Sequence, residues 1–192
     1  MGIFGKGQSR VKAGIHRIRQ RLPFALKGLD SDNGGEFINR HLYNYCWDEK
    51  NIFTRSRSYK KNDSCHVEQK NWNVVTRVIG YGRYNSRAAL AALINTYSLL
   101  RLYMNFFQPV MKIVSKEKHG ARVRKVYDTA QTPYRRLLKS GILPDAKQCE
   151  LKELCQSLNP ALLLEYINSS LELLWKLEAK HNSRKPYRIH RF

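Results

Sequence analysis

Acidic residues are scarce in this sequence of 192 residues, where 15 Asp and Glu stand against 35 Lys and Arg and the formal net charge is +20. The first 29 residues contain no acid at all. So large an excess of positive charge bears on partners rather than on fold. Polyanions are the expected partners, because each phosphate that a cation neutralises releases counterions. Nucleic acid is favoured over a membrane surface, and a solubilising surface or a ribosome-like structural role is the plainer alternative.

Other absences narrow the class of protein. None of the four cysteines belongs to a Cys-x-x-Cys pair and no two histidines have zinc-finger spacing, so reduced thiols of an intracellular protein are expected rather than a zinc site. Residues 1–10 contain no apolar stretch long enough for a signal peptide. The longest apolar stretch, residues 88–107, contains Asn95 and Arg101, which are costly in lipid. A buried helix is therefore expected there, with no membrane partner and a cytoplasmic location, nucleoid-associated if the protein is bacterial.

The first half of the chain alternates helical and strand patterns. Apolar residues recur at helical spacing before Pro23, and the segment that follows Pro23 suits a mostly buried strand. The basic segment before Ser64 has no apolar periodicity, which is typical of an exposed loop. The expected elements are, in order, a helix (11–22), a buried strand (24–30), a turn (31–35), a helix (37–46), a short strand (52–55), a loop (55–64) and a helix (64–80).

The second half is helical in character. Ser86 is expected to cap a long apolar helix that ends near Phe107, and Asn159 to cap the last helix, which Pro160 begins. Residues 110–134 are basic and poor in periodicity. The two closing helices are expected at 145–157 and 160–181, and the apolar stripe of the second comprises Leu163, Ile167, Leu171, Leu174 and Trp175.

Two carboxylates, Asp32 and Glu68, are candidate catalytic residues because of their spacing. Asp32 stands in Asp-Asn-Gly at the end of the expected strand, and Glu68 stands near the start of the expected helix, with thirty-five residues between them. Asn71 lies one turn beyond Glu68, and Tyr59 lies nine residues before it, in the basic loop. Taken alone, Asp-Asn-Gly is most often a turn, and Glu68 is an ordinary acid in the first turn of a helix.

Together, the order of elements, the Asp-Asn-Gly motif, the loop and the D-35-E spacing resemble the catalytic core of retroviral integrases and the related bacterial insertion-sequence transposases, the DDE-type family. The resemblance covers about residues 10–82. It implies an α/β fold, a partial ribonuclease H-like core lacking its first strands and followed by a mostly α-helical C-terminal region. The implied organisation is an irregular start (1–9), a partial integrase core (10–84), a helical region (85–182) and a basic tail (183–192).

The resemblance also implies a metal site and a DNA partner. Asp32 and Glu68 would be catalytic and would bind Mg²⁺ or Mn²⁺, since phosphodiester cleavage and strand transfer use two ions about 4 Å apart and Mg²⁺ prefers oxygen ligands. Family members act as homo-oligomers on element ends and target DNA. The implied supporting residues are Asp30, Asn33 and Gly34, and the implied DNA-binding residues are Arg55, Arg57, Tyr59, Lys60, Lys61 and Asn71.

One carboxylate of the family's Asp, Asp, Glu set is absent. The first Asp of the family lies well upstream of the second, where this sequence has no acid. We therefore expect an N-terminally truncated transposase that is inactive in DNA transposition or integration as it stands. The alternative is a non-catalytic basic DNA-binding fragment, so whether the chain is an enzyme stays open. A glycosidase-like acid pair is disfavoured, because nothing indicates a sugar-binding cleft.

Overall fold

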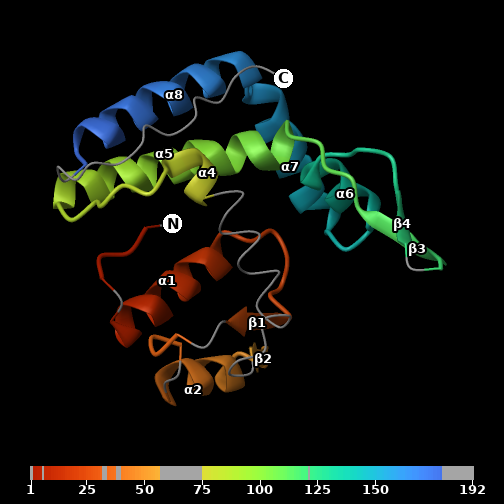
Figure 1. Ribbon diagram of the computed structural model, residues 1–192, viewed down its shortest axis with the longest axis horizontal. Coiled ribbons are helices and arrows are strands. Elements are labelled where there is room, and N and C mark those ends of the chain that lie inside the picture. Colours follow the sequence, from red (N-terminus) through yellow and green to blue (C-terminus); the bar gives the residue numbers. More distant parts are fainter. Residues whose placement is uncertain are drawn as a thin grey trace. The chain divides into compact units, whose positions relative to one another are not determined.

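The computed structural model of the chain describes residues 2–5, 7–31, 34–37, 40–56, 75–120 and 122–178. Over these residues the chain is mixed α/β, with long helices and two small sheets of two strands each (Figure 1). It divides into two compact units, one with the residues up to Tyr97 and those from Asn168 on, the other with Ser98–Ile167. Helices α5 (Arg87–Phe106) and α8 (Pro160–Lys176) each contribute to both units.

The first unit begins with a small α/β core. Strand β1 pairs in parallel with β2, and α2 forms the connection between them. The buried side chains of α2 are Leu42, Tyr45 and Cys46, and burial raises the pKa of the Cys46 thiol. The elements are α1 (Gln8–Gln20), β1 (Gly28–Ser31), α2 (Arg40–Asp48) and β2 (Ile52–Arg55), and the half-buried side chains against the α2 cluster are Ile15, Leu29, Phe37 and Phe53.

Polar contacts tie α1 to α2. Arg19 forms a 2.6 Å ion pair with Glu49, and the rings of His16 and Tyr45 meet edge to face with centroids 6.0 Å apart. The ion pair is about one-third exposed, and such pairs contribute about 0–1 kcal/mol. Packing of the apolar cluster on α2 therefore does most to hold α1 in place.

Of the two strands expected in the first half of the chain, the second is confirmed and the first is shorter than expected. Strand β2 has the expected bounds, whereas β1 starts at Gly28 instead of residue 24, and Phe24 is 41% exposed. A mostly buried strand over 24–30 is therefore wrong. The reason is that a strand extends only as far as its partner does, and β2 is four residues long.

A buried polar network joins α5 to α8 within the first unit. The Thr96 hydroxyl donates to Ala92 O at 2.9 Å and lies 2.7 Å from the Ser170 hydroxyl, and Asn95 Nδ2 donates to that Ser170 hydroxyl at 3.1 Å. Trp175 Nε1 donates to the Ile79 carbonyl at 3.2 Å, which fixes the short α4 (Arg77–Ile79). Each of these buried polar groups has a partner, as burial requires.

The helix ends follow the capping residues expected from the sequence. Ser86 Oγ accepts from Ala89 N at 3.0 Å, and Asn159 Oδ1 accepts from Ala161 N at 2.9 Å. Helix α7 (Asp145–Ser157) has the expected bounds, and α8 ends at Lys176 rather than at residue 181. Over the described ranges, no helix combines the length and the apolar character needed to cross a bilayer.

The second unit contains a β-hairpin that the sequence did not predict. Strands β3 (Ile113–His119) and β4 (Arg122–Tyr127) pair in antiparallel fashion, and α6 (Pro133–Lys139) follows them. The helical character expected from Ser86 onward therefore does not extend over this segment. The hairpin is exposed along nearly its whole length, so neither face requires the apolar alternation by which strands are found in sequence.

A carboxylate fixes the base of this hairpin. Asp128 Oδ1 accepts from Lys112 N at 2.7 Å, and Arg136 of α6 donates to both oxygens of Asp128, at 2.6 and 3.0 Å. Arg136 also donates to Val110 O at 2.8 Å. The two-pronged hydrogen bond and the backbone contacts lower the pKa of Asp128 to about 2, from an ordinary value near 4.

Truncation of the buried stripe on α8 tests the packing of the first unit. Leu171 is wholly buried, and Leu173, two residues away, is 53% exposed. We expect Leu171→Ala to lower the free energy of unfolding by about 2–5 kcal/mol, because it removes buried methyl groups and leaves a cavity. Leu173→Ala should change it by no more than about 0.5 kcal/mol. Urea unfolding followed by circular dichroism measures both, and equal destabilisation by the two substitutions would contradict this packing.

Acid should weaken the base of the hairpin. Because folding lowers the pKa of Asp128, its stabilising effect is complete above about pH 4 and is lost as the pH falls through about 2. We expect Asp128→Asn to be less stable than wild type at pH 7 and the difference to vanish between pH 4 and 2. Guanidinium unfolding of both proteins at several pH values measures that difference, in which the other carboxylates cancel. A difference independent of pH would contradict the role given to the ionised carboxylate.

Candidate functional site

The candidate site lies where β1 and β2 end. Their parallel register places Ser31 opposite Arg55, and Ser56 N donates to Ser31 O at 3.0 Å. The carboxyl ends of both strands therefore lie at the same edge of the sheet. In open α/β sheets this is the edge at which ligands bind.

Asp30 is tied to the neighbouring strand at this edge. It stands opposite Thr54 in the register, and Thr54 Oγ1 donates to Asp30 Oδ1 at 2.8 Å. The bond fixes the direction of the Asp30 carboxylate, one residue before the strand ends. Sequence reasoning did not single out Thr54, because its role depends on the register of two strands, which no local pattern reveals.

The described residues hold part of the predicted site. Asp30 and Arg55 lie in β1 and β2, Arg55 is exposed, and Gly34 lies in the turn that follows β1. Other predicted residues lie outside the described ranges: Asp32, Asn33, Arg57, Tyr59, Lys60, Lys61, Glu68 and Asn71.

The chain connectivity nevertheless relates these predicted residues to the edge. Asp32 directly follows Ser31, the last residue of β1, and Arg57 directly follows Ser56, whose N–H is bonded to Ser31. The Asp-Asn-Gly motif and the basic segment thus follow, in sequence, two strands whose carboxyl ends share one edge of the sheet. Their first residues are joined to one pair of hydrogen-bonded strands.

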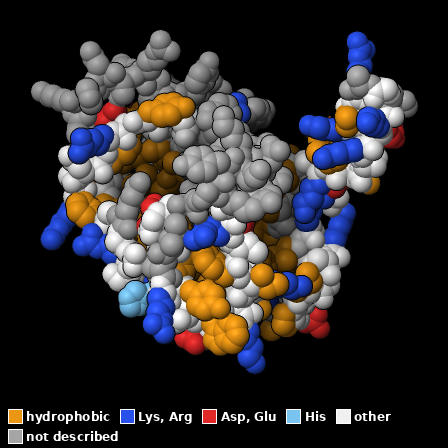
Figure 2. Space-filling model, turned by 60° about the horizontal axis from the view of Figure 1, so that its bottom comes forward, with side chains coloured by type: hydrophobic (Ala, Val, Ile, Leu, Met, Phe, Trp, Pro, Cys, Tyr) orange, Lys and Arg blue, Asp and Glu red, His pale blue; other side chains and the backbone are white. Residues whose placement is uncertain are grey.

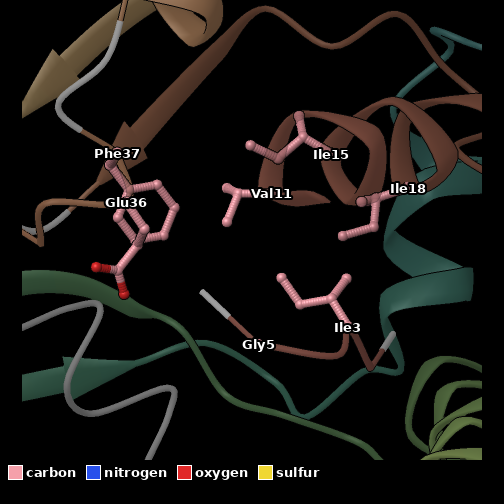
Figure 3. Close-up of a pocket in the computed structure, with 8 residues that line it drawn as sticks. Ile3, Gly5, Val11, Ile15, Ile18, Glu36 and Phe37 are labelled. Carbon is pink, nitrogen blue, oxygen red and sulfur yellow. The ribbon is translucent and has the colours of Figure 1, made fainter. Parts of the chain in front are cut away.

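An apolar cavity of about 380 Å³ lies beside this core (Figure 3). Ile3, Val11 and Ile15 contribute side chains to it, and Phe37 borders it from the turn after β1. In Figure 3 the Glu36 carboxylate lies at the edge of the cavity rather than in its interior. Of the lining residues that the structure describes, Glu36 is the only charged one, so the cavity suits apolar side chains and not phosphate.

A metal site needs several ligating side chains close together. Within the described ranges, no three of His, Cys, Asp and Glu come close enough together to hold an ion. Asp30 is the one acid of the predicted set inside these ranges.

Comparison with known proteins gives a relative of similar sequence but no family. No protein-family model matches the chain. An uncharacterized protein, y4rM, of Sinorhizobium fredii (strain NBRC 101917 / NGR234) is 43% identical to it over 126 residues. The match covers 66% of this chain and 36% of y4rM, so this chain spans about a third of the relative's length.

Gly28 offers a test of the close approach of the two strands. A Cβ added at Gly28 would lie 3.0 Å from the Ile52 carbonyl oxygen, whereas one added at Gly35 would meet nothing within 4 Å. We expect Gly28→Ala to cost about 1–3 kcal/mol through overpacking, and Gly35→Ala to change stability by no more than about 0.5 kcal/mol.

Thermal unfolding of the two variants measures these changes in stability. Hydrogen exchange adds a measurement at the paired strands themselves. The Ser56 amide, bonded to Ser31 O, should exchange faster in Gly28→Ala and at the wild-type rate in Gly35→Ala. An unchanged Ser56 amide in a destabilised Gly28→Ala protein would contradict the parallel pairing.

Proposed function

We propose that this chain is part of a DDE-type polynucleotidyl transferase that acts in DNA transposition or integration. The observation that carries the proposal is the shared edge of β1 and β2, since the Asp-Asn-Gly motif and the basic segment follow these two strands in the sequence. A phosphoryl-transfer site of this class needs carboxylates at a strand end together with cations for the DNA backbone. The sequence supplies both kinds of group next to that edge.

The finer fold belongs to the same proposal. A helix, a strand, a second helix and a second strand parallel to the first, in the order α1, β1, α2, β2, agree with the later part of a ribonuclease H-like core. The long helices that follow agree with a helical C-terminal region, which here also contains the β3–β4 hairpin.

In this proposal Asp32 and Glu68 hold the metal, Mg²⁺ or Mn²⁺, which when bound would neutralise charge on the scissile phosphate. Asp30, held by Thr54, supports the end of the strand from which Asp32 follows. Residues 1–29 offer no third carboxylate, so this chain alone holds an incomplete family set. Weak or absent cleavage by the isolated chain follows from that shortage of ligands.

The proposed DNA contacts are cationic and polar. Arg55, exposed at the end of β2, begins a run of groups suited to phosphate oxygens. That run continues with Arg57, Lys60 and Lys61 in the sequence, and Tyr59 and Asn71 complete the proposed set.

The second candidate function is DNA binding without catalysis. It is favoured by the net charge of +20 and by the absence of acids from residues 1–29. Both functions include salt-sensitive binding to DNA. They differ in what the two carboxylates do, since only the transferase needs Asp32 and Glu68 to bind a divalent metal.

Metal binding therefore decides between the two. We expect the chain to bind Mn²⁺ in calorimetry, and Asp32→Asn and Glu68→Gln each to weaken that binding at least about tenfold, because each removes a carboxylate ligand. Asp48→Asn, which removes an exposed acid at the end of α2, should leave it unchanged. Binding of Mn²⁺ unaffected by Asp32→Asn and Glu68→Gln would favour the non-catalytic function.

Cleavage of supercoiled plasmid in Mn²⁺ is the companion measurement. The isolated chain should cut weakly or not at all, because its carboxylate set is incomplete. Efficient cleavage that Asp32→Asn abolishes would confirm the reaction class and overturn the expectation of inactivity.

A further inference from the structure

The β3–β4 hairpin, called the ribbon below, presents one face on which three lysines lie together. Lys116 stands opposite Lys125 in its register, and Lys118 stands opposite Val123. Because side chains alternate along a strand and cross-strand partners share a face, these four residues lie on the same face. All four side chains are exposed, so the face is open to a partner.

No carboxylate belongs to this lysine face (Lys116, Lys118, Val123 and Lys125). The two acids of the hairpin region are placed elsewhere: Glu117 stands opposite Arg124 on the other face, and Asp128 is bonded to Arg136 at the base. Figure 2 shows Lys and Arg side chains gathered along the ribbon, at the upper right of that view. At the root of the hairpin the charge of Asp128 is thus paired with that of Arg136, whereas the lysine face carries positive charge and includes no acid.

The charge arrangement has an energetic cost to the free protein. Like charges directly opposite each other destabilise a strand pair, and an isolated two-stranded hairpin is at best marginally stable in water. Lys116 and Lys125 are such a pair. An anionic partner would screen the repulsion between the two lysines. Both side chains are exposed, so packing within the ribbon gives no reason for placing them opposite each other.

The base holds the ribbon in a defined position on its own unit. Besides the Asp128–Arg136 pair, Val110 and Gln131 exchange backbone hydrogen bonds of 3.0 and 3.2 Å. At the other end, Gly120 has a φ of 61°, which lets the chain reverse between the strands. In Figure 1 the hairpin extends away from α6, so its lysine face is carried on an arm with a fixed base.

The shape of the ribbon selects among polyanions. The major groove of B-form DNA, about 12 Å wide, admits a two-stranded β-ribbon, and the deep, narrow major groove of A-form RNA does not. Lysine ammonium groups bind phosphate as point charges, which suits contact to the backbone rather than to a particular base. Duplex DNA therefore fits both the width and the charge of the ribbon.

We infer that the lysine face of the ribbon is a duplex-DNA docking surface, which enters the major groove and contacts phosphates through Lys116, Lys118 and Lys125. The inference rests on the proposed function only in sharing DNA as the partner. It involves no metal and no residue of the β1–β2 edge. The two proposals can thus fail separately.

The test measures how tightly the full chain binds DNA in EDTA. The fluorescence anisotropy of a labelled 20-base-pair duplex reports the binding, over a range of salt concentrations. The triple variant Lys116→Gln, Lys118→Gln, Lys125→Gln should bind about tenfold more weakly or worse at moderate salt. Its slope of log Kobs against log salt should be shallower by about 2.7, or 0.9 for each phosphate that is no longer neutralised. Replacing the same lysines with arginine should preserve binding.

A matched control removes the same charge elsewhere. Lys27→Gln, Lys139→Gln, Lys152→Gln changes three lysines that are also exposed, and it should reduce the slope by less than about 0.9. Equal weakening of DNA binding in the two triple variants would overturn the inference, because binding would then depend on net charge alone. Thermal unfolding should show both variants to be folded, since all six side chains are exposed.

Two further probes address other polyanions. Duplex RNA of the same sequence should bind with little dependence on the lysine face, and weakening of RNA and DNA binding to the same degree would overturn the choice of DNA. Vesicles of 30% phosphatidylserine and 70% phosphatidylcholine test a membrane surface. If the ribbon variant no longer bound vesicles but still bound DNA, the face would be a membrane contact and the inference would be wrong.

Discussion

The parallel pairing of β1 with β2 is the constraint on which the candidate site depends. It sets Asp30 opposite Thr54 and Ser31 opposite Arg55, and it brings the carboxyl ends of the two strands to one edge. A shift of the register by one residue would turn every side chain of β1 to the other face of the sheet. The α2 cluster prevents that shift from one side, because Leu29 and Phe53 pack against its buried side chains.

The small size of this sheet explains much of its exposure. A sheet of two strands has only edge strands, and such edges can accept a further strand. Ile52 in β2 is 69% exposed, a value unusual for a large apolar side chain in the core of a sheet. The pairing of β1 with β2 fixes the edge through its own register and hydrogen bonds.

Local signals in the sequence predicted local structure well, and non-local structure poorly. The caps at Ser86 and Asn159 and the bounds of α7 were predicted correctly, because a helix end is decided by a side chain and the backbone within three residues of it. The start of β1 and the whole ribbon were not predicted correctly, because where a strand forms depends on the strand that pairs with it and not on local signals alone. The same limit applies to the site: Asp30 drew attention because it stands two residues before Asp32, but its hydrogen bond to Thr54 joins residues twenty-four positions apart and left no local signal.

The distribution of acids explains why the positive charge concerns partners more than stability. Asp30 is bonded to Thr54 of β2, Glu49 joins α1 to α2, and Asp128 fixes the ribbon to α6, so at least three of the fifteen acids connect one element to another. The remaining cations repel one another and destabilise the compact state. Exposed ion pairs return little of that cost, typically less than about 1 kcal/mol each. We propose that this surplus, which the fold does not use, serves as a surface for polyanions, and that the lysine face of the ribbon is one place where duplex DNA would bind.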